Sequence, residues 1–311
     1  MPGDEFDWIA RLLRPLTRGA PEALDLLDDA AVLPSRPGYD LVVTKDAMVA
    51  GVHFLADDPL DLVARKLLRV NLSDLAAKGA EPYGYLLSTA WPRDTAWADK
   101  ARFASGLAED GDAFNLILLG GDTVSTPGPL TLTATLLGWV PQGRAILRRG
   151  ASPGDRLAVS GVIGDGWLGL QAARGELDSP KLAERYRLPQ PRLDLVEALR
   201  GHARAAADVS DGLLADAGHL ATVSGCRVVI DLGLTPLSPE AARWLATQAD
   251  EASGRLALAT GGDDYQIVCA LAEGGIPEGF TVIGRFEDGE GTRVVFAGQD
   301  IAVSRAGWTH G

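Results

Sequence analysis

The chain is short of cysteine, of long hydrophobic runs and of basic residues, and each shortage excludes something. Its 311 residues include only two cysteines, Cys226 and Cys269, whereas a disulfide framework or a typical structural zinc site needs about four. No stretch approaches the roughly 18 uninterrupted apolar residues of a membrane-spanning helix. The acidic residues 1–7 lack the apolar core of a signal peptide. We therefore expect a cytoplasmic protein with reduced thiols and no membrane partner.

Basic residues are outnumbered by acidic ones. Lys and Arg total 29 against 42 Asp and Glu, which gives a formal net charge of −13. A surface this negative repels phosphate backbones and anionic lipid headgroups, so the composition predicts no nucleic-acid partner. Most of this charge is interpreted as a solvated surface that keeps the protein in solution.

Several common catalytic signatures are also missing. The chain has no G-x-x-x-x-G-K-[ST] phosphate loop, no H-R-D or D-F-G segment of the protein-kinase type, and no Ser/His/Asp elbow of a hydrolase. The four histidines, His53, His202, His219 and His310, are scattered along the chain. This scatter argues against a histidine-based metal site.

What the chain has instead is aspartate in short turns rich in Gly, Ser, Thr and Ala. Such segments recur at residues 28–31, 44–46, 71–74, 120–123, 208–212 and 261–265. A single Asp beside Gly is most often a turn or helix-capping residue, so each segment by itself is weak evidence. If all of them converge, their carboxylates repel one another and lose hydration. Such a cluster requires hard divalent cations, whose usual partner is a polyphosphate.

Two of these segments have a predictable local geometry. Asn71 and Asp74 lie three residues apart on a helix expected at 59–80, so they share one of its faces. Asp208 and Asp211 flank a strand-to-helix turn, where Ser210 is placed to cap the following helix. The start of that helix would also offer unpaired N–H groups to an anion. Both arrangements suit a site for metal-bound phosphate.

Apolar runs and helical periodicities alternate along the chain, which predicts an α/β fold. In the first half, strands are expected at 41–44, 85–89, 116–119 and 130–136, and helices at 6–16, 59–80 and 95–109. In the second half, strands are expected at 156–160, 228–230, 266–269 and 281–283, and a helix at 212–223. The turn-rich segment 150–155 follows a group of arginines. We therefore predict two domains, 1–143 and 144–311.

Taken together, the six segments, with 51–54 and Gly307-Trp308, resemble the motifs of the thiamine-monophosphate kinase family. That family lies in an ATP-binding superfamily that includes aminoimidazole ribonucleotide synthetase, and the resemblance runs nearly end to end in one order. It implies two α/β domains, a homodimer whose N-terminal sheets form a barrel, and one site split across the two domains. It also implies phosphorylation of thiamine monophosphate to thiamine diphosphate by in-line transfer from ATP, assisted by Mg²⁺.

The resemblance assigns roles to individual residues. The family's magnesium ligands match Asp29, Thr44, Asp46, Asp74, Asp122, Asp208 and Asp211. Its ATP contacts match Gly121, Arg148 and Ser210. Its contacts to thiamine phosphate match His53, Asp263 and Trp308, the last as an aromatic surface for an electron-poor ring. The neighbouring acids Asp28 and Asp264 are expected to support these residues.

The chain departs from the family pattern in several places. Leu26 and Leu27 precede the first Asp pair, where the family often has glycine. Lys45 stands where a second Thr is common, and Asp263 and Gln266 each replace a usual Glu. The C-terminal tail lacks the usual ending. These changes affect the expected metal count and substrate contacts, while the six aspartates remain.

Other functions stay open on the sequence alone. Selenophosphate synthetases carry a reactive Cys or selenocysteine near the N-terminus, and hydrogenase-maturation relatives end in a Cys-bearing tail; this chain has neither feature. A purine-pathway synthetase remains the alternative enzyme, although His53 and Trp308 in their contexts favour thiamine. A non-catalytic metal- or nucleotide-binding regulator is the alternative from a different class.

Overall fold

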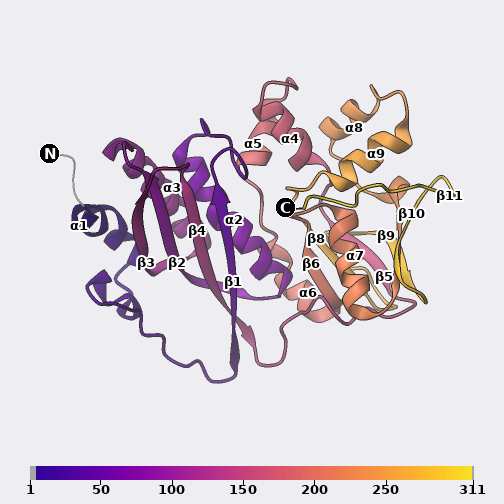
Figure 1. Cartoon of the computed structure of the whole chain (residues 1–311). Coiled ribbons are helices and arrows are strands. Elements are labelled where there is room, and N and C mark those ends of the chain that lie inside the picture. Colours follow the sequence, from indigo (N-terminus) through magenta and orange to yellow (C-terminus); the bar gives the residue numbers. More distant parts are fainter. Residues whose placement is uncertain (1–4, 310–311) are drawn as a thin grey trace. The chain divides into compact units, whose positions relative to one another are not determined.

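The computed structural model describes residues 5–309 of the chain. Residues 1–4, part of the acidic start, and residues 310–311, which include His310, lie outside the described residues. The chain forms two compact units: Met1–Leu75 with Ala80–Gly143, and Ala76–Gly79 with Arg144–Gly311. Figure 1 colours the first unit from indigo to magenta and the second from pink to yellow. Within residues 5–309, no helix combines the length and the apolar character needed to cross a membrane.

The first unit is built on a four-stranded sheet. Its strands are β1 (Tyr39–Val49), β2 (Glu81–Pro92), β3 (Ile117–Thr126) and β4 (Thr131–Pro141), in the order β1-β4-β2-β3. β4 pairs antiparallel with β1 and β2, whereas β2 and β3 run parallel. Two long helices, α2 (Leu60–Ala77) and α3 (Trp97–Phe114), accompany the sheet (Figure 1). The strands expected at 41–44, 85–89, 116–119 and 130–136 and the helices expected at 59–80 and 95–109 are confirmed, with ends that shift by several residues.

Within residues 5–309, the core lies against one face of this sheet, and the other face carries exposed side chains. The side chains of β4 that point inward, such as Leu132, Ala134 and Leu136, are fully buried. On β1, exposed side chains alternate with half-buried or buried ones, as expected for a strand with one face on a core and the other facing out. The exposed face carries the large apolar side chains of Leu41, Val43, Leu86 and Val124.

The N-terminal segment differs from the expected single helix at 6–16. It forms the successive turns α1 (Glu5–Trp8), η1 (Ile9–Leu13) and η2 (Arg14–Thr17), followed by η3 (Pro21–Leu26). Phe6, expected on the apolar face, is 77% exposed, whereas Trp8 is buried. The Trp8 indole packs edge-on against Trp91 and donates its N–H to the Thr123 hydroxyl at 3.1 Å. An indole has both a large apolar surface and a donor to satisfy, so it replaces Phe6 as the anchor.

The second unit is built on a seven-stranded sheet with the order β11-β10-β7-β9-β5-β8-β6. Its strands are β5 (Arg156–Ser160), β6 (Ala203–Asp208), β7 (Arg227–Asp231), β8 (Ile267–Leu271), β9 (Phe280–Glu287), β10 (Gly291–Phe296) and β11 (Gln299–Asp300). The helical elements are α4 (Asp165–Ala173), α5 (Pro180–Arg187), η4 (Leu193–Leu195), α6 (Val196–His202), α7 (Leu213–Ser224), η5 (Leu232–Leu234), α8 (Pro239–Leu245) and α9 (Glu251–Thr260).

Both faces of the second sheet are covered over its central strands. Leu157 and Val159 of β5 belong to the same hydrophobic cluster as α7. Ala158, which lies between them, belongs to the cluster that includes Val196 and Leu199 of α6. Because successive side chains of a strand point to opposite faces, the sheet lies between these two apolar layers. The predicted α/β architecture is therefore confirmed.

Candidate active site

In the first unit, β1 and α2 bring three of the expected magnesium ligands together. Thr44 and Asp46 point from β1 toward α2, where Asn71 and Asp74 lie one helical turn apart. The Thr44 hydroxyl donates to the Asp74 carboxylate. The side-chain oxygen of Asn71 accepts the N–H of Asp46 at 3.1 Å, and its amide nitrogen donates to the Leu67 carbonyl at 2.9 Å. Asn71 therefore fixes the strand to the helix at the point where the carboxylates meet.

This cluster has the electrostatic character of a cation site. Burial, and then the negative charge of Asp74, raises the pKa of Asp46 to about 6. Two carboxylates and a hydroxyl in a partly buried position are hard oxygen donors, which are the ligands that Mg²⁺ prefers. A divalent cation would remove the repulsion that raises the pKa of Asp46. The residues present therefore fit magnesium.

Asp122 lies on the other face of the same sheet. β2 and β3 pair with an irregularity after Tyr85, so that Tyr85 lies opposite Leu118 but the next residue, Leu86, lies opposite Gly120. The extra residue in β3 is a bulge that reverses the facing of every later side chain. Thr123 consequently points inward, and exposed Asp122 points outward. Within this unit, the structure does not bring Asp122 together with Asp46 and Asp74.

Two further residues of the first unit have well-defined surroundings. A Cβ at Gly121 would lie 1.8 Å from the Leu87 carbonyl oxygen, so only glycine fits beside β2 there. His53 follows β1, and its Nδ1 accepts the Val49 N–H at 3.1 Å. The buried Lys66 donates to the His53 carbonyl at 3.1 Å. Because Nδ1 accepts the Val49 N–H, the proton of the neutral imidazole lies on Nε2.

Asp29 lies in an exposed segment without helix or strand. Its N–H donates to the side chain of Asp28 at 2.8 Å. Just before this pair, Leu24, Asp25 and Leu26 all have left-handed backbone angles, with φ of 48°, 56° and 55°. This conformation favours glycine, and here three consecutive residues other than glycine adopt it.

In the second unit, a turn at residues 210–212 connects three segments that carry expected site residues. The Ser210 carbonyl accepts the N–H of Asp263 at 2.9 Å, and the Asp211 carbonyl accepts the N–H of Trp308 at 2.8 Å. The chains approach closely, since a Cβ at Gly262 would lie 2.6 Å from the Ser210 oxygen. The structure therefore brings Ser210, Asp211, Asp263 and Trp308 together. Asp208 precedes the turn, nearly fully buried at the end of β6.

The amides of this turn are already occupied, contrary to expectation. Asp216, in the first turn of α7, accepts the N–H groups of Ser210, Asp211 and Gly212 through one oxygen, at 3.1, 3.2 and 3.3 Å. The N-cap position of α7 is Gly212, and no side chain caps it, so the expected capping by Ser210 is wrong. The sequence analysis missed Asp216; the available signal was an acidic residue in the first turn of α7.

The electrostatics of Asp216 connect it to Arg148. Burial, then the charge of Asp211, raises the pKa of Asp216 to about 7, and the guanidinium of Arg148 opposes that rise. The exposed Arg148 therefore lies within electrostatic range of the turn. Asp211, Asp216 and His219 also form a group of three possible metal ligands whose donor atoms lie within 4.8 Å of one another.

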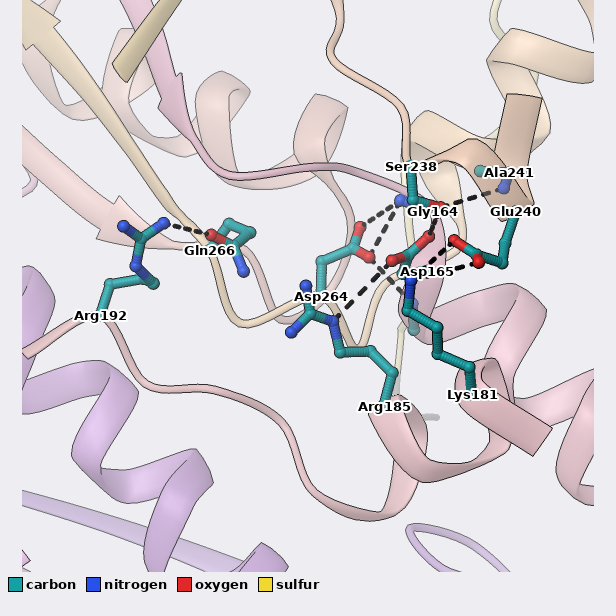
Figure 2. A network of polar contacts seen from close by, with 11 residues as sticks. Gly164, Asp165, Lys181, Arg185, Arg192, Ser238, Glu240, Ala241, Asp264 and Gln266 are labelled. Atoms are coloured by element: carbon teal, nitrogen blue, oxygen red, sulfur yellow. Dashed lines mark hydrogen bonds and ion pairs between the residues drawn. The ribbon is translucent and has the colours of Figure 1, made fainter. Parts of the chain in front are cut away.

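A second buried carboxylate, Asp264, holds the loop before α4. Both of its oxygens accept the Gly164 N–H at 2.9 Å, and one also accepts the Gly166 N–H at 3.0 Å. Figure 2 shows this carboxylate turned toward the start of α4. Burial raises the pKa of Asp264 to about 7. Its neighbour Asp263 has a left-handed backbone, with φ of 60°, and accepts a hydrogen bond from the Tyr265 hydroxyl at 3.0 Å.

Polar contacts from several elements hold this loop in place (Figure 2). Ser238, before α8, donates to Asp165, and Arg185 of α5 lies 3.8 Å from the same carboxylate. The Gln266 side-chain oxygen accepts from Arg192 at 3.1 Å, so Gln266 has a basic partner. Trp308 is half exposed, and the guanidinium of Arg305 lies 5.3 Å from its ring centre.

Family models and solved structures agree on the class of the protein. The AIR synthase related protein models match residues 27–140 (N-terminal domain) and 152–297 (C-terminal domain). HypE in complex with ATP, at 17% identity and a TM-score of 0.77 over 97% of this chain and 95% of that chain, shares the fold. The two-domain fold implied by the resemblance is thus confirmed.

More similar relatives narrow this class. Thiamine-monophosphate kinase of Caulobacter vibrioides is 61% identical over 100% of this chain and 92% of the relative, and the Escherichia coli K12 enzyme is 38% identical over 98% of both. The Stenotrophomonas maltophilia thiamine-monophosphate kinase structure, 34% identical, has a TM-score of 0.80 over 93% of this chain and 95% of that chain. The chain belongs to the thiamine-monophosphate kinase family.

Proposed function

We propose that this chain is a kinase that phosphorylates thiamine monophosphate to thiamine diphosphate with ATP. The observation that carries the proposal is its similarity to AaThiL, which was solved with AMPPCP and TMP bound. That structure is 30% identical, with a TM-score of 0.80 over 98% of this chain and 96% of that chain. AMPPCP is an ATP analogue, so the pair of ligands in AaThiL matches a nucleotide donor and a phosphate acceptor.

The chemistry of the proposed reaction is a phosphoryl transfer between two anions. An oxygen of the thiamine monophosphate phosphate forms a bond to the γ-phosphorus of ATP, and the bond from that phosphorus to the ADP oxygen breaks. Because the acceptor oxygen is already anionic, no strong general base is required. The chain's task is to hold the two polyanions in line and to offset their repulsion.

The carboxylates of both units are proposed to hold Mg²⁺, which supplies positive charge to the phosphates when bound. In the first unit the proposed ligands are the carboxylates of Asp29, Asp46, Asp74 and Asp122 and the hydroxyl of Thr44. In the second unit they are the carboxylates of Asp208 and Asp211. Support comes from the convergence of Thr44, Asp46 and Asp74 and from the raised pKa of Asp46. The remaining ligands rest on the family motifs.

Other residues are proposed to bind the organic substrates. Gly121, Arg148 and Ser210 are assigned to ATP, and the charge of Arg148 suits its phosphates. His53, Asp263 and Trp308 are assigned to thiamine monophosphate. The half-exposed Trp308 offers ring surface for the pyrimidine or the cationic thiazolium.

We also propose a homodimer formed through the open face of the first sheet, with the two sheets making a barrel. The face carries the exposed side chains of Leu41, Val43, Leu86 and Val124, and large apolar side chains exposed on one sheet face favour a partner. Asp122 lies on the same face, so a second copy would lie beside it. A cytoplasmic location is proposed as well, supported by two buried cysteines that form no disulfide.

The test is an assay of ADP release with and without thiamine monophosphate, while magnesium is titrated. The proposal predicts ADP release that requires both. ADP release with a purine-pathway substrate instead would favour a synthetase, and nucleotide binding without turnover on any phosphate acceptor would favour a regulator.

A further inference from the structure

Asp216 makes an unusual set of contacts for a residue outside the expected ligands. Its side chain is only 1% exposed. One carboxylate oxygen accepts three consecutive backbone N–H groups, those of Ser210, Asp211 and Gly212. A backbone N–H group that is shielded from water destabilises the fold unless it has a hydrogen-bond acceptor. Asp216 therefore fixes the direction of three successive peptide groups.

The carbonyl groups of the same turn are bound by the two segments that carry Asp263 and Trp308. The carbonyls of Ser210 and Asp211 accept the N–H groups of Asp263 and Trp308. The backbone at Gly307 packs closely against the turn, because a Cβ at Gly307 would lie 2.5 Å from the Asp211 carbonyl oxygen. A movement of the turn would consequently be passed to both segments.

We propose that Asp216 is a positioning residue for the reaction: it sets the turn that carries Ser210 and Asp211 and, through that turn, the segments that carry Asp263 and Trp308. The role rests on the proposed function, because it concerns residues assigned to ATP, metal and thiamine monophosphate. Asp216 acts by accepting hydrogen bonds from the backbone of the turn.

A competing role is that Asp216 itself binds a cation. The donor atoms of Asp211, Asp216 and His219 lie within 4.8 Å of one another, and a carboxylate is a far better ligand for Mg²⁺ than an amide. The two roles respond differently to Asp216→Asn, because asparagine keeps an acceptor oxygen but loses the charge. Positioning predicts substantial rescue by Asn relative to Ala, whereas ligation predicts that both substitutions fail alike.

The experiment measures KM for ATP and for thiamine monophosphate, kcat, and the magnesium requirement of Asp216→Ala and Asp216→Asn. A matched control is Asp155→Ala in the same unit. Asp155 is also a buried carboxylate (3% exposed) that accepts a backbone N–H, from Ser152 at 2.8 Å. We expect both KM values to rise about 10- to 100-fold in Asp216→Ala and to stay within about threefold of the native values in Asp216→Asn. Asp155→Ala should lose thermal stability with unchanged KM values.

A second measurement does not require turnover. The melting temperature with and without MgAMPPCP should show a ligand-induced increase that is lost in Asp216→Ala and retained in Asp216→Asn and Asp155→Ala. If Asp216→Ala does not fold, Asp216→Ser takes its place, because its shorter side chain cannot reach three amides.

Two results would overturn the inference. One is an Asp216→Ala enzyme with native KM values and a native MgAMPPCP response. The other is equal failure of Asp216→Ala and Asp216→Asn with a raised magnesium requirement, which would make Asp216 a ligand. A native protein that releases no ADP with thiamine monophosphate would instead contradict the proposed function, while the MgAMPPCP response would still test Asp216.

Discussion

Asn71 joins Asp46 to helix α2: its side-chain oxygen accepts the Asp46 N–H at 3.1 Å while its nitrogen donates to the Leu67 carbonyl at 2.9 Å. The residue is fully buried, so neither partner has water as a substitute. The distance between the carboxylates of Asp46 and Asp74 depends on this link between strand and helix.

Asn71→Leu should therefore destabilise the protein and weaken magnesium binding together. We expect a loss of about 1–3 kcal/mol in the free energy of unfolding, because the Asp46 N–H loses its hydrogen-bond acceptor. Urea denaturation gives the stability, and a magnesium titration of ADP release gives the metal requirement, which should rise.

The neighbour Ser73 supplies the control for Asn71. Its hydroxyl is buried and has no hydrogen-bond partner within the described residues, so Ser73→Ala should leave stability unchanged or slightly raised. Equal magnesium requirements in Asn71→Leu and the native protein would show that the link does not position the carboxylates.

Asp122→Asn and Asp208→Asn should each reduce turnover by about 10²-fold or more, because each removes a proposed negative ligand from the site proposed to hold polyphosphate. Circular dichroism should show an intact fold in both. Asp112→Asn is the control, since Asp112 is an exposed residue of α3 with 76% of its side-chain surface accessible. Near-native turnover in both substituted enzymes would remove the basis for the metal assignment.

Stability should fall as the pH rises from about 4 to about 7, in part because of Asp264. Burial raises its pKa to about 7 in the folded protein, whereas an unfolded Asp titrates near pH 3.8. Between these values the folded state binds more protons than the unfolded state, so the contribution of Asp264 is fully present below the unfolded pKa and is lost as the pH passes the folded pKa.

Asp264→Asn isolates this contribution, because Asn does not titrate yet keeps an oxygen for the Gly164 and Gly166 amides. We expect the melting temperature of the native protein minus that of Asp264→Asn to decrease between about pH 5 and pH 8. A difference that stays constant or increases over that range would contradict the raised pKa.

Val43→Asp should convert the proposed dimer to a monomer, because it places a charge on the open face of the sheet, on the edge strand β1. Val43 is 56% exposed, so the fold of the isolated chain should persist. The control is Val223→Asp on α7, where the native side chain is 54% exposed. Sedimentation velocity should show a change in mass for Val43→Asp alone; a native protein that is itself a monomer would contradict the dimer.

Periodicity was enough to predict most strands and helices, because these elements follow the alternation of apolar residues. It was not enough for the facing of Asp122. That facing depends on the bulge between Leu118 and Gly120, and the pairing of strands distant in sequence is not visible in either strand. The contacts of Asp216 were hidden for a similar reason, since the directions of its three N–H donors depend on how the turn at 210–212 bends. The prediction for the N-terminal helix was wrong at Phe6. Trp8 is buried instead, because it packs against Trp91 and donates to Thr123.

The turn at 210–212 is held at its amides by Asp216 and at two of its carbonyls by distant segments. Its backbone is therefore ordered when the chain folds, and the entropy of ordering it is not lost again when a nucleotide arrives. The three amides should exchange with deuterium as slowly as those of the central strands, even though they lie in a turn. In the proposed site, this part of the chain therefore supplies a rigid connecting segment and not a movable loop.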